Sequence, residues 1–96
     1  MKTFVILTRR ADGAAEDFKR LAKPEVVHVW QGFAGGIVRA VHGLADGPGA
    51  AFELESVTFE EARDYIEALP YVKGNLLHVQ YCALKPFPDY ERLVSS

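Results

Sequence analysis

The sequence predicts an α+β fold whose strands and helices follow the order β-α-β-β-α-β. Two observations carry this prediction. Short apolar runs, several of them rich in β-branched residues, occur at four places, and the longer segments between them have apolar residues at helical spacing. The chain has 96 residues, of which 49% are hydrophobic. This length and composition favour one domain over residues 1–96 with a core of its own.

The first strand is predicted at 3–9, where the apolar run "TFVILTR" is followed by the turn-like "RRADG". A run this apolar indicates a strand buried on both faces. Two helical segments follow, "AAEDFKRLA" at 14–22 and "PEVVHVWQGFA" at 24–34, because Pro24 fits a first helical turn but breaks a helix interior. The segment at 24–34 has the apolar residues Val26, Trp30 and Phe33 on a single face.

Three further strands are predicted, two of them paired in a hairpin. "IVRAVH" at 37–42 and "AAFELES" at 50–56 are joined by Asp46-Gly47-Pro48-Gly49, a strong turn sequence. The last strand, "LLHVQYCAL" at 76–84, has two different faces because side chains alternate along a strand. One face carries Leu77, Val79, Tyr81 and Ala83, and the other carries His78, Gln80 and Cys82.

The two segments at 14–22 and 24–34 together occupy the first helical position of the fold. The helix of the second position is predicted between the hairpin and the last strand. Thr58 and Glu61 fit a capping box at its start, and Pro70 stops it. Its expected buried stripe consists of Phe59, Ala62, Ile66 and Leu69, with Tyr65 at the margin. The remaining residues, "KPFPDYERLVSS" at 85–96, are expected to form a C-terminal arm.

This order of elements is the split βαβ, or ferredoxin-like, plan: a four-stranded antiparallel sheet with both helices on one face. Two helices leave the other face of the sheet for water or for a second subunit. That face is expected to carry Arg39, Glu53, Glu55, His78, Gln80 and Cys82. A sheet face that is partly polar and partly apolar suits a homodimer that encloses cavities.

Composition excludes several classes of function. The net charge is −2 with no basic stripe, which argues against nucleic acid as a partner. The sequence has no apolar run near the roughly 18 residues that span a membrane, and no secretory leader pattern. Cys82 is the single cysteine, so no internal disulfide or cysteine-pair metal site is expected, and a reducing, cytoplasmic setting is favoured.

Four short motifs resemble the muconolactone-isomerase-like and YciI-like branch of the dimeric α/β barrels. They are Gly-Ile-Val-Arg at 36–39, Asp-Gly-Pro-Gly at 46–49, the Glu-Ala…Leu-Pro helix end at 61–70 and Pro-Phe-Pro at 86–88. The resemblance covers nearly the whole chain and concerns fold more than chemistry. It implies homodimers, or larger homo-oligomers, whose sheets face each other. Many such proteins are cofactor-free enzymes acting on small oxygenated molecules, including lactone isomerases, cyclases, monooxygenases and decarboxylases.

Histidines are the first candidates for proton transfer, because an unperturbed imidazole titrates near pH 6.5. His28 resembles a first-helix histidine of the methylmuconolactone methylisomerases, and its alternative role is an exposed partner of Glu25 or Gln31. His78 is expected on the uncovered sheet face, as an acid–base group or as a hydrogen-bonded interface residue. The His–Asp pair associated with YciI-like proteins has its nearest counterparts in His42 and Asp46, across a loop.

The remaining candidates are a carboxylate, an arginine and a set of aromatic residues. Glu53 interrupts an otherwise apolar strand, so we expect a salt bridge to Arg39 or a raised pKa suited to acid–base work. Arg39 would hold developing negative charge. Arg9 and Arg10 are either a solvated charge pair or a cavity-mouth site for an anion. The expected pocket walls are Trp30, Phe52, Tyr65 and Tyr71.

The sequence therefore predicts a cofactor-independent, metal-free isomerase, cyclase or lyase that moves a proton on a small lactone, enol or polyketide-like metabolite. The expected catalytic residues are His28, His78 and Glu53, and Arg39 and the aromatic residues bind the substrate. Two alternatives stay open, because one scaffold hosts many chemistries. They are a cofactor-free monooxygenase of a polyphenol and a non-catalytic YciI-like protein that binds a ligand or assembles.

Overall fold

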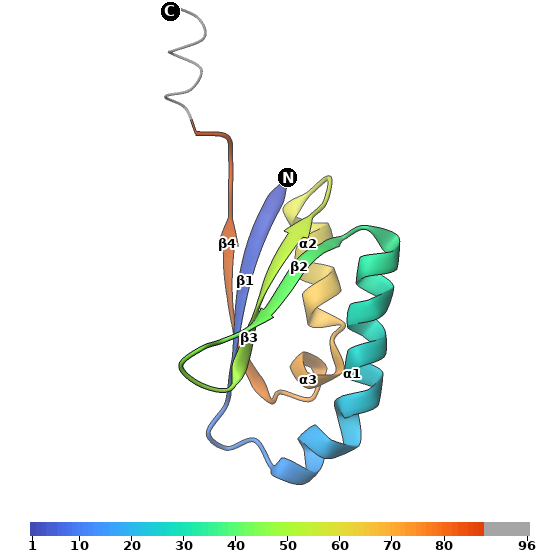
Figure 1. The fold of residues 1–96 in the computed structure, drawn as a ribbon, viewed down its shortest axis with the longest axis vertical. Coiled ribbons are helices and arrows are strands. Elements are labelled where there is room, and N and C mark those ends of the chain that lie inside the picture. The colour runs from blue at the N-terminus through green and yellow to red at the C-terminus, as the bar shows by residue number, and fades with distance from the viewer. Residues whose placement is uncertain (88–96) are drawn as a thin grey trace, which may run out of the picture.

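A computed structural model describes residues 1–87 of the chain. Its elements are β1 (Lys2–Arg9), α1 (Ala15–Gly35), β2 (Val38–Gly43), β3 (Gly49–Glu55), α2 (Phe59–Glu67), α3 (Pro70–Lys73) and β4 (Leu77–Ala83). The strands form one antiparallel sheet in the order β2-β3-β1-β4, and the helices lie on one side of it (Figure 1). The predicted ferredoxin-like fold is confirmed, with β4 at an edge.

The core lies between the helices and the inner face of the sheet. Strand register aligns the inward residues, since Val5 of β1 lies opposite both Phe52 of β3 and Tyr81 of β4. Buried residues of the core are Val5, Leu7, Val38, Phe52, Leu54, Ala62, Ile66 and Leu69. The alternation that the sequence shows in β3 and β4 therefore places the expected side chains against the helices.

The outer face of the sheet carries no helix of the described chain, and it is a mixed surface. Phe4 is 41% exposed there, so the expectation that the first strand is buried on both faces is wrong for the single chain. Phe4, Ile6, Ala40 and Ala51 line a hollow of about 350 Å³, with His42 and Glu53 at its margin. His78, Gln80 and Cys82 are exposed, which agrees with the predicted faces of the last strand.

Helix α1 is one continuous helix of 21 residues with Pro24 inside it, so the predicted restart at Pro24 is wrong. Its orientation also differs from the expectation that Trp30 lines a pocket. Val26 and Trp30 are each 67% exposed, and Phe33 is 39% exposed. The residues that face the sheet and the other helices include Phe18, Leu21, Glu25, His28 and Gly32. The more apolar stripe therefore points away from the core.

Helix α2 begins as its sequence predicts. The side chain of Thr58 accepts a hydrogen bond from the Glu61 backbone N–H at 3.2 Å, and Glu61 Oε2 accepts one from the Val57 N–H at 3.2 Å. The first bond satisfies a backbone donor that the first helical turn leaves unpaired, and the second satisfies the N–H of the residue before the N-cap. The helix ends at Glu67, and Pro70 begins the one-turn helix α3. This third helix was not predicted, and it places Tyr71 against α1.

The predicted C-terminal arm falls largely outside the described residues, since only Lys85, Pro86 and Phe87 belong to both. These three residues follow β4 without regular secondary structure. Among residues 1–87, α1 is the longest helix, and no helix is both long and apolar enough to cross a membrane.

Candidate functional site

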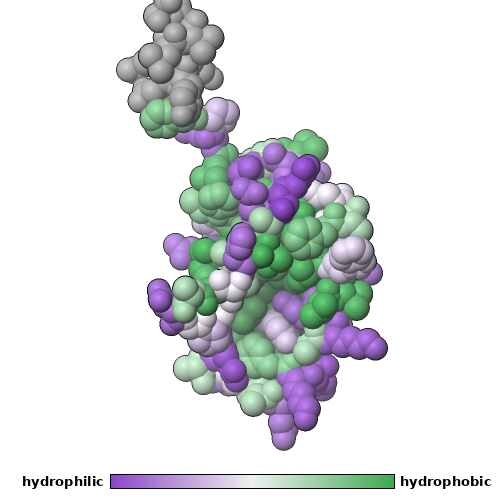
Figure 2. All heavy atoms as spheres, in the orientation of Figure 1, coloured by the Kyte–Doolittle hydropathy of each residue, from purple (hydrophilic) through white to green (hydrophobic). Residues whose placement is uncertain are grey.

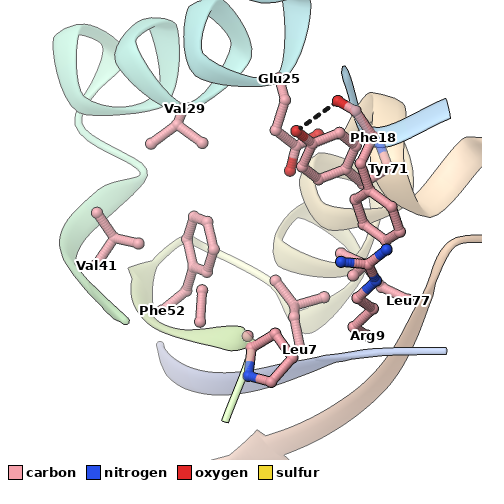
Figure 3. A pocket seen from close by; sticks show the side chains of 12 residues that line it. Leu7, Arg9, Phe18, Glu25, Val29, Val41, Phe52, Tyr71 and Leu77 are labelled. Atoms are coloured by element: carbon pink, nitrogen blue, oxygen red, sulfur yellow. Dashed lines mark hydrogen bonds between the residues drawn. The ribbon is translucent and has the colours of Figure 1, made fainter. Parts of the chain in front are cut away.

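A cavity of about 340 Å³ lies between α1, α3 and the inner face of the sheet, and Figure 3 shows its side chains. Most of the wall is apolar, formed by Leu7, Val29, Val41, Pro48, Ala50, Phe52 and Leu77. One end differs, because Glu25 projects from α1 toward Phe18 and Tyr71, with Arg9 close by (Figure 3). In Figure 2 the same region is a hollow between the sheet and α1. An apolar pocket with a few convergent polar groups is typical of a small-molecule site.

Glu25 is a partly buried acidic group in this wall. Its Oε1 accepts a hydrogen bond from the backbone N–H of Tyr71 at 3.0 Å, so α3 fixes the carboxylate. Burial raises the pKa of Glu25 above its ordinary value, although the Tyr71 N–H and the nearby His28 oppose that rise. Desolvation disfavours the charged form of a carboxyl group. A carboxyl group whose pKa is raised by burial is a candidate for acid–base work.

Arg9 supplies positive charge at the same end of the cavity. Its guanidinium carbon lies 4.2 Å from the centre of the Phe18 ring, a cation–π contact that leaves the N–H groups available. Arg10, its neighbour, is paired instead with Asp12 at 3.1 Å. Among the ion pairs of residues 1–87, none includes Arg9. The guanidinium can therefore hold an anionic group of a ligand.

Tyr71 connects α3 to α1 at this end of the site. Its hydroxyl donates to the Phe18 carbonyl at 3.1 Å, and its ring meets the Phe18 ring edge to face at 5.1 Å. Burial, and to a smaller degree the charge of Glu25, raises the pKa of the Tyr71 hydroxyl. The hydroxyl therefore stays a donor at neutral pH, and the contact ties α3 to α1.

His28 has a structural position rather than a place in this cavity wall. Its Nε2 hydrogen-bonds the Tyr65 carbonyl at 3.0 Å, its ring stacks on the Tyr65 ring at 4.5 Å, and the Tyr65 hydroxyl donates to the His28 carbonyl at 3.0 Å. Because a carbonyl only accepts, Nε2 carries the proton. Burial raises the pKa of Tyr65 to about 12, so its hydroxyl remains a donor. The pair fastens α1 to α2.

The other predicted polar residues lie on the outer side of the sheet or at its end. Glu53 pairs with Lys2 at 3.2 Å, where the sequence led us to expect Arg39. Arg39 falls at a register shift between Val38 and Ala40 and lines a shallow hollow at the end of α1. His78 is exposed on β4 opposite Thr8. The structure therefore does not bring Glu53, Arg39 and His78 together with His28.

The predicted aromatic walls divide into two sets. Phe52 and Tyr71 line the cavity, whereas Tyr65 packs against His28 and Trp30 is largely exposed. Glu25 was not predicted as a site residue and was named only as a partner of His28. Its signal was present in the sequence, because Glu25 shares a helical face with Phe18 and His28. Arg9 was named, with a solvated charge given as its other role.

The described residues show no ready-made metal centre. Within residues 1–87, no group of three or more histidine, cysteine, aspartate or glutamate side chains lies close enough together to hold a metal ion. The polar end of the cavity instead offers one carboxylate and one guanidinium, a set that suits an organic anion with an exchangeable proton.

Solved structures share this architecture across most of the chain. Muconolactone isomerase superposes with a TM-score of 0.76 over 92% of this chain and 92% of its own, at 17% identity. The chain has the fold of muconolactone isomerase. The 5-chloro-2-hydroxyhydroquinone dehydrochlorinase (TftG) of Burkholderia phenoliruptrix AC1100, solved with 2,5-dihydroxybenzoquinone, gives 0.68 at 13% identity over 91% of this chain and 97% of that one. No family model and no curated protein sequence matches.

The muconolactone-isomerase fold agrees with the resemblance seen in the short motifs of the sequence. At these levels of identity the likeness concerns the path of the chain and not its side chains. The chemistry of the site therefore depends on the side chains that line the cavity.

Proposed function

We propose that the protein is a cofactor-independent catalyst of proton transfer on a small oxygenated metabolite, of the isomerase, cyclase or lyase kind. One observation carries the proposal. A partly buried carboxylate, Glu25, whose pKa is raised lines the same apolar cavity as the guanidinium of Arg9. The proposal keeps the predicted reaction class and moves the proton-transfer role from His28, His78 and Glu53 to Glu25.

The proposed step needs only these two charged groups. Glu25 takes a proton from a carbon next to a carbonyl, and the electron pair of the broken C–H bond moves onto the carbonyl oxygen. Arg9 stabilises the resulting enolate by charge-assisted hydrogen bonds. The carboxylic acid then returns the proton to another carbon of the conjugated system, which gives the isomer and restores the carboxylate.

The shape of the cavity and the solved relatives support a flat, oxygenated substrate. The apolar wall opposite the polar end suits a ring or a short conjugated chain. One structure of this fold is named for muconolactone, and the other was solved with 2,5-dihydroxybenzoquinone. Both compounds are compact and oxygen-rich, so they are the first probes to use.

We also propose that the outer sheet face pairs with a second copy of the chain. Phe4, Ile6, Ala40 and Ala51 form an apolar hollow there, with Glu53 and His42 at its margin. Exposed apolar surface of this kind marks interaction sites. His78 would then be an interface residue, and the location expected for the protein remains the cytoplasm.

The test of the function is proton exchange with solvent. Wild-type protein is incubated with muconolactone in D₂O and followed by proton NMR, and binding of 2,5-dihydroxybenzoquinone is measured by calorimetry. We expect deuterium to enter the probe and the quinone to bind. An oxygen electrode run in parallel separates proton transfer, which consumes no dioxygen, from oxygenation of a polyphenol.

Arg9→Ala and Arg10→Ala form the matched pair for the anion site, since Arg10 is already paired with Asp12. Arg9→Ala should weaken quinone binding by about ten-fold or more, as expected for a lost charged hydrogen bond of about 1.5–3 kcal/mol. Arg10→Ala should bind like wild type. Absence of exchange and of binding for both probes, or equal effects of the two substitutions, contradicts the proposal.

A further inference from the structure

A tight turn between β1 and α1 brings the side chains of Arg9 and Phe18 together. β1 ends at Arg9, and α1 begins at Ala15. Between them the N–H of Gly13 donates to the Arg10 carbonyl at 3.1 Å, which closes the turn. Phe18 follows in the first turn of α1 and lines the cavity together with Arg9. The turn therefore places an aromatic ring beside the last residue of the strand.

The sheet fixes the backbone of Arg9, whereas its long side chain depends on the ring of Phe18. The backbone lies opposite Leu77 of β4, and its N–H donates to the Pro48 carbonyl at 3.4 Å. The side chain is exposed at the edge of the cavity and forms no ion pair within residues 1–87. What holds the guanidinium is the face of the Phe18 ring, 4.2 Å away.

The ring of Phe18 is itself fixed from two sides. The Tyr71 ring meets it edge to face at 5.1 Å with an angle of 64° between the ring planes, and the Tyr71 hydroxyl donates to the Phe18 carbonyl at 3.1 Å. Gly13 lies so close that an added Cβ would be 2.9 Å from Phe18 Cε2. A ring held by α3 and by the turn gives the guanidinium a fixed surface (Figure 3).

We propose that Phe18 is a positioning residue, whose ring holds the Arg9 guanidinium at the cavity before an anionic ligand binds. This inference rests on the proposed function, because it concerns the anion site of the same cavity. An aromatic face attracts a guanidinium through the charge distribution of the ring. A free arginine side chain loses much rotamer freedom when a ligand fixes it. A guanidinium that is already in place avoids that loss, so the ligand binds more tightly.

Two other roles of the Phe18 ring must be separated from positioning. The ring packs α1 against α3, and it also forms part of the cavity wall. Phe18→Leu keeps an apolar side chain but removes the aromatic face. If the ring acts through Arg9, this substitution has no effect once Arg9 is absent. If the ring acts through packing or through direct contact with the ligand, the effect is the same with and without Arg9.

A double-mutant cycle with 2,5-dihydroxybenzoquinone as the probe makes this separation, with binding measured by NMR titration. Phe18→Leu should weaken binding about three- to ten-fold, and Phe18→Tyr should restore it to within about two-fold of wild type. In an Arg9→Ala background, Phe18→Leu should change binding by less than about two-fold. Leu21→Val is the packing control, because Leu21 lies close to Gly74 at the end of α3, and it should bind like wild type.

The ligand-free protein gives a second readout, which needs no ligand. Protons above an aromatic ring resonate upfield, so the Arg9 side-chain protons should lie upfield of those of Arg10, which pairs with Asp12. Phe18→Leu should abolish this shift, and Phe18→Tyr should keep it. Absence of the shift in wild type overturns the inference.

The outcomes distinguish failure of this inference from failure of the proposed function. If the wild-type protein does not bind the quinone, the anion site of the proposed function fails, and the inference fails with it. If the wild-type protein binds the quinone but Phe18→Leu weakens binding equally in both Arg9 backgrounds, the inference alone is overturned. Loss of binding in Leu21→Val as large as that in Phe18→Leu would also overturn it, since packing would then be sufficient.

Discussion

The two faces of the sheet place similar side chains in opposite environments. On the inner face Glu25 meets an apolar cavity, and its carboxylate is fixed by the Tyr71 N–H. On the outer face Glu53 is paired with Lys2 at 3.2 Å and is 32% exposed. Both are glutamates near aromatic residues, but Glu53 forms an ion pair, whereas Glu25 forms none with the described part of the chain and burial raises its pKa. Surroundings, and not residue type, therefore decide which carboxylate can work as an acid or base.

The largest expected effect is on catalysis. Glu25→Gln should lower the rate of proton exchange by about 10²–10⁴-fold, because the amide keeps an acceptor for the Tyr71 N–H but cannot take a proton. Glu53→Gln should leave the rate within about two-fold of wild type, since it removes only a surface ion pair worth at most about 1 kcal/mol. The measurement is initial rate by NMR at pH 7.5 for both variants.

The opposite order of exchange rates in these two variants would move the reactive site from the inner cavity to the outer face of the sheet. If Glu53→Gln lost exchange while Glu25→Gln kept it, the outer hollow with His42 would become the reactive site. Circular dichroism and the melting temperature of each variant exclude misfolding as the cause of any loss.

Local patterns were sufficient to predict the sheet and the two faces of its last strand, although not the exposed outer face of β1. Period-two alternation identified Leu77 and Val79 as inward, and turn chemistry at 46–49 predicted the hairpin. The orientation of α1 was beyond such patterns, because the helix has two stripes at the same spacing and the more apolar one faces outward. What selects the inner stripe is a distant contact: Gly32 allows the Tyr65 ring to approach, and no neighbour in the sequence signals it.

The same reason explains why Glu25 was missed. Its partner, Tyr71, lies 46 residues further along the chain, on a helix of one turn that was not predicted. Glu53, by contrast, was conspicuous because it interrupts an apolar strand, and it proved to be an ordinary ion-paired residue. A polar residue within an apolar strand can be recognised from its neighbours in the sequence. A raised pKa depends on contacts with distant residues, which only the folded structure shows.

The next largest effect is on the stability of the fold, and it differs between the inner and the open side of α1. Gly32→Ala adds a methyl group that would collide with the Tyr65 hydroxyl and with Val38, so we expect a loss of about 1–3 kcal/mol in unfolding free energy. Gly35→Ala meets nothing within 4 Å on the open side and should be neutral or stabilising by up to about 1 kcal/mol. Urea unfolding compares them, and equal stability of the two variants would contradict the inward placement of Gly32.

The smallest effect is the pH dependence of stability that Glu25 introduces. Burial raises its pKa above the value of 4.5 that it has in the unfolded chain. Between those two values the folded state binds more protons than the unfolded state, so stability falls as the pH rises. The contribution of the protonated carboxyl is fully present below pH 4.5 and is lost above the raised pKa.

Glu25→Gln removes this titration, so the difference in unfolding free energy between the variant and wild type should change with pH in one direction. Relative to wild type, the variant should gain stability as the pH rises from 4 to 8, with the change beginning near pH 4.5. The difference isolates Glu25 from other acids, such as Asp12, whose pKa is lowered by its bond to Arg10. A constant difference across this range, in urea titrations at four pH values, would place Glu25 in a solvated environment like that of Glu53.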